Sequence, residues 1–121
     1  MAKEKILVVE DSPTDLRLVA GPLQRHGYQV ITAVDGEQAL ERASHERPSL
    51  VVLDVVLPKK SGFQVCRQLK TSPETRDIKV LMLTSKNQES DRFWGLKQGA
   101  DQYMTKPFAD EDLLASVARL L

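Results

Sequence analysis

Five short apolar runs, separated by longer stretches with helical spacing, constrain the fold of this chain more than any other feature of its sequence. The runs are mostly apolar and rich in leucine and β-branched residues. They cover residues 5–9, 28–33, 49–53, 79–83 and, more weakly, 102–104. Nearly continuous apolar runs of this length are typical of strands that are buried on both faces of a sheet. The sequence therefore predicts a parallel sheet.

The stretches between these runs carry signals of helix starts and ends. Such signals are a Ser or Asp at the N-cap, a Pro in the first turn and a Gly after the last turn. They predict helix starts after Ser12, Asp35 and Ser61, helix ends at His26-Gly27 and Gln98-Gly99, and a last helix over 110–121. Pro22 lies inside the first helical stretch, where it removes a hydrogen bond and is expected to kink the helix.

Strands and helices alternate five times, with no repeat or low-complexity tract between them. This alternation predicts a parallel sheet that right-handed crossovers cover with helices on both faces. A chain of 121 residues has the size of one domain. We therefore expect a single doubly wound α/β domain over residues 1–121.

The charge balance and the single cysteine exclude several classes of protein. Lys plus Arg and Asp plus Glu number 17 each, so a chain with zero formal net charge is not expected to bind nucleic acid or membrane. Cys66 is the only cysteine, which excludes an internal disulfide and suits a reducing compartment. The first apolar run is too short for a signal sequence or a membrane span. We therefore expect a soluble, cytoplasmic protein.

Polar residues follow four of the five predicted strands. They are Glu10 and Asp11, Asp54, Thr84 and Ser85, and Lys106, which is followed by Pro107. In a parallel sheet the carboxyl ends of the strands meet at one edge, where ligands bind. Crowded carboxylates need a cation or a proton and suit Mg²⁺, while a Lys and a Thr suit phosphate oxygens. Taken alone, each of these residues is just as readily a helix cap or a solvated loop residue.

Together these residues carry a resemblance to a known family. Over essentially its whole length, the chain resembles the receiver domain of two-component response regulators. The matching motifs are Glu10-Asp11, Asp54 followed by Pro58 and Gly62, Thr84-Ser85, and Lys106-Pro107-Phe108. The resemblance implies a flavodoxin-like fold with the strand order 2-1-3-4-5. It also implies a signalling protein, not an enzyme, that assists its own phosphorylation and dephosphorylation.

The resemblance further implies roles for individual residues. Asp54 would accept a phosphoryl group from the phosphohistidine of a sensor histidine kinase or a phosphotransfer protein. Thr84 and Lys106 would bind the phosphoryl oxygens, and the peptide bond before Pro107 would be cis. The ligands of Mg²⁺ would be Asp11, Asp54, the backbone carbonyl of Val56 and, partly through water, Glu10.

Two aromatic residues are assigned to signalling. Tyr103 occupies the family's switch-aromatic position, whose ring swings inward when Thr84 moves toward the phosphate; the other interpretation is a Tyr packed at the edge of the core. Trp94 is either an exposed interface anchor on the fourth helix or a partly buried residue. Four other apolar residues are interpreted as packing residues, namely Phe63, Phe93, Leu96 and Phe108.

The aspartyl phosphate is expected to be long-lived for a receiver. Hydrolysis needs a water in line with the phosphoryl group, and the residues best placed to hold it stand two after Asp54 and two after Thr84. These residues are Val56 and Lys86. Val56 has no polar side-chain atom with which to orient the water. Lys86 either covers the path of attack or points into solvent.

The matching motifs extend over nearly the whole chain, and this determines which partners we expect. From the first strand to the fifth helix, the chain has no room for an output domain, so we expect a stand-alone receiver. It would act as a monomer on a downstream protein that the sequence does not identify. The segment 87–96 is similar to single-domain regulators of type IV pilus twitching motility.

Three other functions fit parts of the pattern. A degenerate receiver that acts only by constitutive binding would lack Asp54, the acidic pair or Lys106, and none is lacking. A flavodoxin-like nucleotide or flavin binder needs a Gly- or Ser/Thr-rich phosphate loop after the first strand, where acidic residues would repel a phosphate. A metal-dependent phosphatase would carry its nucleophilic Asp at the end of the first strand, whereas the candidate here ends the third.

Overall fold

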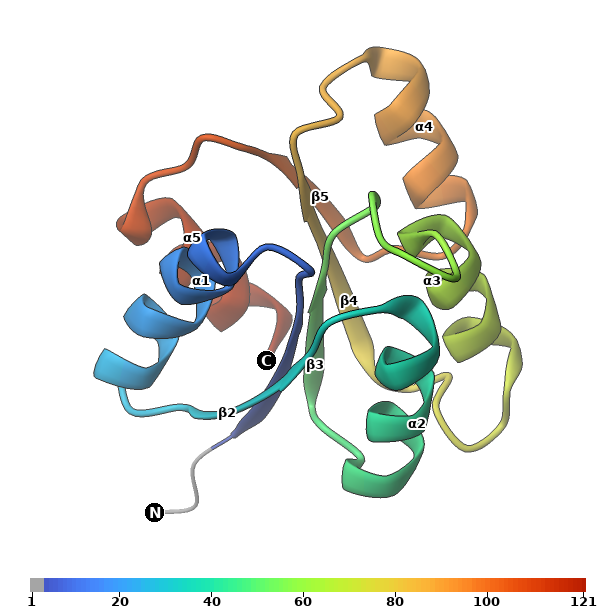
Figure 1. Cartoon of the computed structure of the whole chain (residues 1–121), viewed down its shortest axis with the longest axis horizontal. Helices are drawn as coiled ribbons and strands as arrows, with labels where there is room; N and C mark the ends of the chain where they lie inside the picture. The colour runs from blue at the N-terminus through green and yellow to red at the C-terminus, as the bar shows by residue number, and fades with distance from the viewer. Residues whose placement is uncertain (1–3) are drawn as a thin grey trace.

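The strands form one parallel sheet in the order β2-β1-β3-β4-β5, and helices cover both of its faces (Figure 1). The computed structural model describes residues 4–121. The strands are β1 (Lys5–Val9), β2 (Gln29–Ala33), β3 (Leu50–Leu53), β4 (Lys79–Thr84) and β5 (Gln102–Thr105). The helices are α1 (Pro13–Arg25), α2 (Gly36–Glu46), α3 (Gly62–Thr71), α4 (Glu89–Lys97) and α5 (Asp110–Leu120). The predicted α/β fold and strand order are confirmed.

The strand bounds differ from the predicted ones at a few ends. Tyr28 lies before β2, because its N–H donates to the carbonyl of Leu23 and so belongs to the turn after α1. β4 and β5 each extend to a threonine, because Thr84 and Thr105 are register partners in the sheet. The strands β4 and β5 therefore extend further toward the predicted site than the apolar segments alone indicate.

Two apolar layers enclose the sheet. The helices α1 and α5 pack on one face, whereas α2, α3 and α4 pack on the other (Figure 1). The central strand β3 is buried throughout, and β1 is buried from Ile6 onward, while the edge strand β2 is only partly buried. This explains why the central strands read as unbroken apolar runs.

The predicted helix starts after Ser12, Asp35 and Ser61 are confirmed. The side chains of these three residues accept hydrogen bonds from the backbone N–H groups of Asp15, Gln38 and Gln64, at 3.3, 2.7 and 3.3 Å. Each bond satisfies an amide that the first turn leaves without an intrahelical partner. α1 continues past the buried Pro22 to Arg25, so the kink at Pro22 stays a prediction.

The packing predicted for α4 is wrong in two places. Phe93 and Leu96 are exposed, at 64 and 41% of their surface, and it is Gly95 that faces the sheet. Trp94 is also exposed, at 51%. Phe63 and Phe108 do pack against the core, as predicted. None of the helices within residues 4–121 is long and apolar enough to cross a membrane.

Candidate functional site

The strand register brings the acidic residues together at the carboxyl edge of the sheet. In the pairing of β1 with β3, Val9 lies opposite Leu53, so Glu10 and Asp54 follow neighbouring strands at the same level. The N–H of Asp54 donates to the carbonyl of Val9 at 3.2 Å. This edge is also where the strand order reverses between β1 and β3, the place where open α/β sheets bind ligands.

Glu10, Asp11 and Asp54 form an acidic cluster, in which one oxygen from each lies within 4.8 Å of the others. Glu10 and Asp54 are buried, whereas Asp11 is exposed. Burial raises the pKa of Glu10 to about 8; the Asp54 charge adds to this effect, and the hydrogen bond from Lys106 opposes it. Burial thus disfavours the charged form of Glu10, and a cation at this position would offset that cost.

The acidic cluster fits a divalent metal ion. The Oε1 atom of Glu10 is buried and has no hydrogen-bond partner among the described residues. A buried carboxylate oxygen without a partner is unfavourable, and a cation near it removes that cost. Carboxylate oxygens in small number are the donors that Mg²⁺ prefers. These residues therefore suit Mg²⁺.

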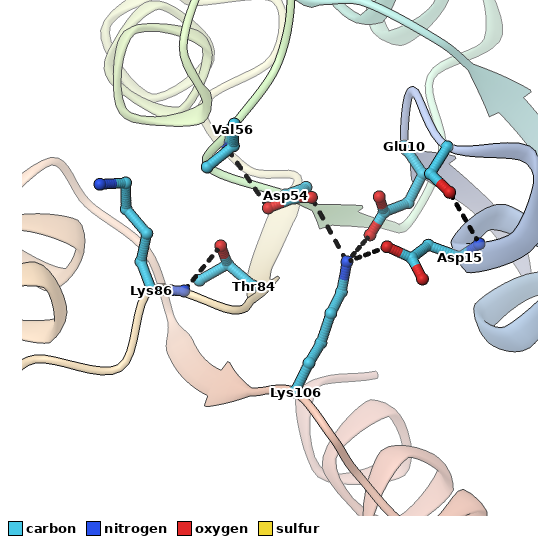
Figure 2. Close-up of polar contacts among 8 residues, drawn as sticks. Glu10, Asp15, Asp54, Val56, Thr84, Lys86 and Lys106 are labelled. Atoms are coloured by element: carbon cyan, nitrogen blue, oxygen red, sulfur yellow. Dashed lines mark hydrogen bonds and ion pairs between the residues drawn. The ribbon is translucent and has the colours of Figure 1, made fainter.

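Lys106 links three carboxylates at this edge (Figure 2). Its Nζ atom donates to Glu10 Oε2 at 2.6 Å, to Asp15 Oδ2 at 3.2 Å and to Asp54 Oδ2 at 3.3 Å. Burial alone would lower the pKa of Lys106, but the bond to Glu10 and the charge of Asp54 outweigh it and raise that pKa. The bond between Lys106 and Pro107 is cis, as predicted. Lys106 is thus a fixed cation beside Asp54.

Asp15 is a member of this site that the sequence interpretation missed. It lies in the first turn of α1, and its carboxylate contacts Lys106 across 91 residues of sequence. The first turn of the helix that follows β1 lies at the same edge as Glu10, but the contact with Lys106 depends on the approach of a distant segment. By sequence alone, Asp15 stands three residues after Ser12, at the position of a capping-box carboxylate.

Thr84 and Val56 border Asp54 on the other side. Thr84 is fully buried, and its Oγ1 atom accepts the N–H of Lys86 at 3.3 Å. The N–H of Val56 donates to Asp54 Oδ1 at 3.2 Å, while its side chain is 53% exposed. The Lys86 side chain is exposed and extends away from Asp54 (Figure 2). The structure therefore has the solvated arrangement of Lys86.

Tyr103 is buried beneath α4, and it contacts Lys86, which borders Thr84 on this side of Asp54. Its hydroxyl donates to the carbonyl of Lys86 at 2.8 Å, and only 4% of the residue is exposed. Burial raises the pKa of Tyr103 to about 12. The backbone of Lys86 thus contacts Thr84 through its N–H and Tyr103 through its carbonyl. Trp94, by contrast, lies on the outer surface of α4, away from the cluster.

Comparisons with known proteins agree with this geometry. Residues 6–118 match the family described as the response regulator receiver domain. The chain is 48% identical to the alkaline phosphatase synthesis transcriptional regulatory protein PhoP of Bacillus subtilis, over 98% of this chain and 48% of that protein. It is 42% identical to the protein PilH of Pseudomonas aeruginosa, over 97% of each. The chain thus spans about half the length of PhoP but nearly all of PilH.

A solved structure bears on the metal. The receiver domain of the sensor histidine kinase PA1611 from Pseudomonas aeruginosa PAO1 superposes with a TM-score of 0.91 at 29% identity, over 98% of each chain. That structure has a magnesium ion coordinated in its active-site cleft. The present chain has an acidic cluster of the kind that suits Mg²⁺. The chain belongs to the response regulator receiver domain family of two-component signalling systems.

Proposed function

We propose that this protein is a phosphorylation-operated switch in which Asp54 accepts a phosphoryl group from a phosphohistidine. The observation that carries the proposal is the position of the Asp54 carboxylate. It belongs to the acidic cluster that suits Mg²⁺, and it accepts a hydrogen bond from the Lys106 ammonium at 3.3 Å. A carboxylate in this setting has cationic charge beside it that can bind the phosphoryl oxygens.

The transfer uses the side chains around Asp54 in distinct ways. An Asp54 oxygen forms the new bond to phosphorus while the bond between phosphorus and the imidazole nitrogen breaks, and its electron pair stays on the imidazole. Lys106 and the hydroxyl of Thr84 bind the phosphoryl oxygens. Glu10, Asp11, Asp54 and the Val56 carbonyl would hold Mg²⁺, which would supply positive charge that offsets the carboxylates and the phosphate.

The signal then leaves through a change in surface contacts. When Thr84 turns toward the phosphoryl group, its hydroxyl leaves the N–H of Lys86, whose carbonyl also binds Tyr103. This contact couples Asp54 to the surface of α4 that carries Trp94. Differential contacts of this kind in two states are what a switch requires.

The partners follow from the chemistry and from the comparisons. The phosphodonor is a sensor histidine kinase or a phosphotransfer protein, and the readout is binding to a downstream protein. We place the receiver in a chemotaxis-like or pilus motility pathway, in line with its match to PilH over 97% of each chain. The single cysteine supports a cytoplasmic location.

Chemical phosphorylation tests the proposal. The protein is incubated with Mg²⁺ and a small phosphodonor such as acetyl phosphate, and the modified peptide is mapped by mass spectrometry. We expect a single aspartyl phosphate at Asp54, dependent on Mg²⁺. Asp54→Asn should abolish it while the far-UV circular dichroism spectrum stays native. Undiminished phosphorylation of that variant would remove Asp54 from the role.

A further inference from the structure

The loop between β3 and α3 lies directly against the N-terminus of α2. Gly36, the first residue of α2, is buried, and its N–H donates to the carbonyl of Pro58 at 3.2 Å. A Cβ atom added at Gly36 would lie 2.6 Å from the Cβ of Lys60, and closer still to the carbonyl oxygen of that residue. The obstacle is backbone, which cannot rotate aside as the end of a long side chain does. Only glycine fits this position without moving the loop.

The conformation of the loop needs this external support. Lys59 has a φ of 70°, in the left-handed region that non-glycine residues rarely adopt. Its Nζ atom lies 3.8 Å from Asp35 Oδ2 and 3.6 Å from Glu37 Oε1, which flank Gly36 in sequence. The start of α2 therefore contacts the loop through backbone packing, a hydrogen bond and opposite charges.

The supported segment continues directly into the proposed metal site. Val56 lies two residues before Pro58, and its N–H donates to Asp54 Oδ1 at 3.2 Å. At the other end of the loop, the N–H of Gly62 donates to the carbonyl of Val55 at 2.8 Å. The loop is thus closed on itself beside Asp54, and α2 supports it from outside. Only one residue separates Val56 from Pro58, so a shift of the loop at Pro58 would reach the Val56 carbonyl through the backbone.

We propose that Gly36 is a positioning residue for Mg²⁺ binding, which sets the path of the loop that carries the Val56 carbonyl. The inference rests on the proposed function, in which that carbonyl and Asp54 are metal ligands. Gly36 is on a different element from all of these ligands, and it contacts the loop at Pro58 and Lys60. Partners that orient metal ligands typically change metal affinity when they are mutated.

A matched pair of glycine substitutions tests the inference. Gly36→Ala forces the loop away from α2, and we expect Mg²⁺ affinity, measured by titration calorimetry, to fall by roughly 3- to 10-fold, below the about 10- to 100-fold common for direct partners of metal ligands. Gly21→Ala is the control, because a Cβ there meets only the mobile end of Arg25, at 3.1 Å. It replaces a glycine inside α1 and should leave Mg²⁺ affinity unchanged.

Each outcome bears on one of the two proposals. Equal Mg²⁺ affinity in Gly36→Ala and in the parent overturns the role of Gly36. If the parent itself binds no Mg²⁺, the proposed function fails, and this inference with it. Should Gly36→Ala not fold, it is combined with the helix-stabilising Gly21→Ala. NMR of the parent then provides a second measurement: Mg²⁺ should shift the Gly36 amide but not the Gly21 amide, and an unmoved Gly36 amide overturns the inference.

Discussion

The two sides of Asp54 are built differently. Toward β1 and α1, the Lys106 ammonium is hydrogen-bonded to three carboxylates, and Glu10 is almost completely buried. Toward β4, the hydroxyl of Thr84 accepts only a backbone N–H at 3.3 Å, and the Lys86 side chain lies in solvent. The first side holds paired charges, whereas on the second side a neutral hydroxyl lies next to a lysine whose side chain is in solvent.

This difference separates binding from switching. Buried charges must be paired, so the side with Lys106 is fixed by electrostatics before any phosphoryl group arrives. A hydroxyl can exchange one hydrogen-bond partner for another at little cost, so Thr84 is free to reorient. We therefore expect substitutions on the first side to affect phosphorylation strongly, and those on the second side to affect the state that follows.

Two lysine substitutions give the largest expected contrast. Lys106→Met removes a fixed cation next to Asp54 and should slow phosphorylation by a small donor about 100-fold, as removal of one stabilising donor commonly does. Lys86→Met changes an exposed side chain and should alter the rate by less than about twofold. Rates are measured at saturating Mg²⁺ by phosphoprotein electrophoresis. Similar rates in the two variants would contradict the division between the sides.

The fold was largely predictable from the sequence, because buried parallel strands require continuous apolar runs. The acidic cluster was predictable for the same reason, since Glu10, Asp11 and Asp54 directly follow two of those runs. The part played by Asp15 was not, because it depends on Lys106 reaching across the edge from β5. No local sequence pattern indicates the contact between Lys106 and Asp15.

The exposure of Phe93 and Leu96 on α4 was also not predicted, for a different physical reason. Phe93, Trp94 and Leu96 stand at nearly consecutive positions, so a helix cannot turn all of them toward the sheet. The buried position is Gly95, where an added Cβ would lie 2.8 Å from the ring of Tyr103. The burial of Tyr103 thus depends on Gly95, which has no side chain. The spacing of apolar residues therefore does not indicate it.

A second pair of variants divides the first side into metal ligands and a support for Lys106. Asp11→Ala removes an exposed carboxylate of the acidic cluster and should weaken Mg²⁺ binding by about tenfold or more. Asp15→Ala removes a contact to Lys106 at 3.2 Å but no member of that cluster, and should change Mg²⁺ affinity by less than about threefold. Calorimetric titration of both variants measures the difference. Equal affinity in Asp11→Ala and the parent would take Asp11 out of the metal site.

The smallest expected effect lies on the second side and concerns the loss of phosphate. An attacking water must be oriented in line with the phosphoryl group, and neither flanking side chain does this: Val56 has no polar atom, and Lys86 points into solvent. Replacing both, with Val56→Asn and Lys86→Glu together, adds groups that can hold the water. We expect hydrolysis at saturating Mg²⁺ to accelerate by several-fold to about tenfold, or roughly 1 kcal/mol of barrier. The rate is followed as loss of phosphate from Asp54 after the donor is removed.

The rate of phosphorylation by a small donor serves as the internal control. Because neither side chain bonds to Lys106, this rate should stay within about twofold of the rate of the parent. An unchanged hydrolysis rate would mean that the second side of Asp54 does not set the lifetime of the phosphorylated state. A parallel loss of phosphorylation would mean that the two sides are not independent.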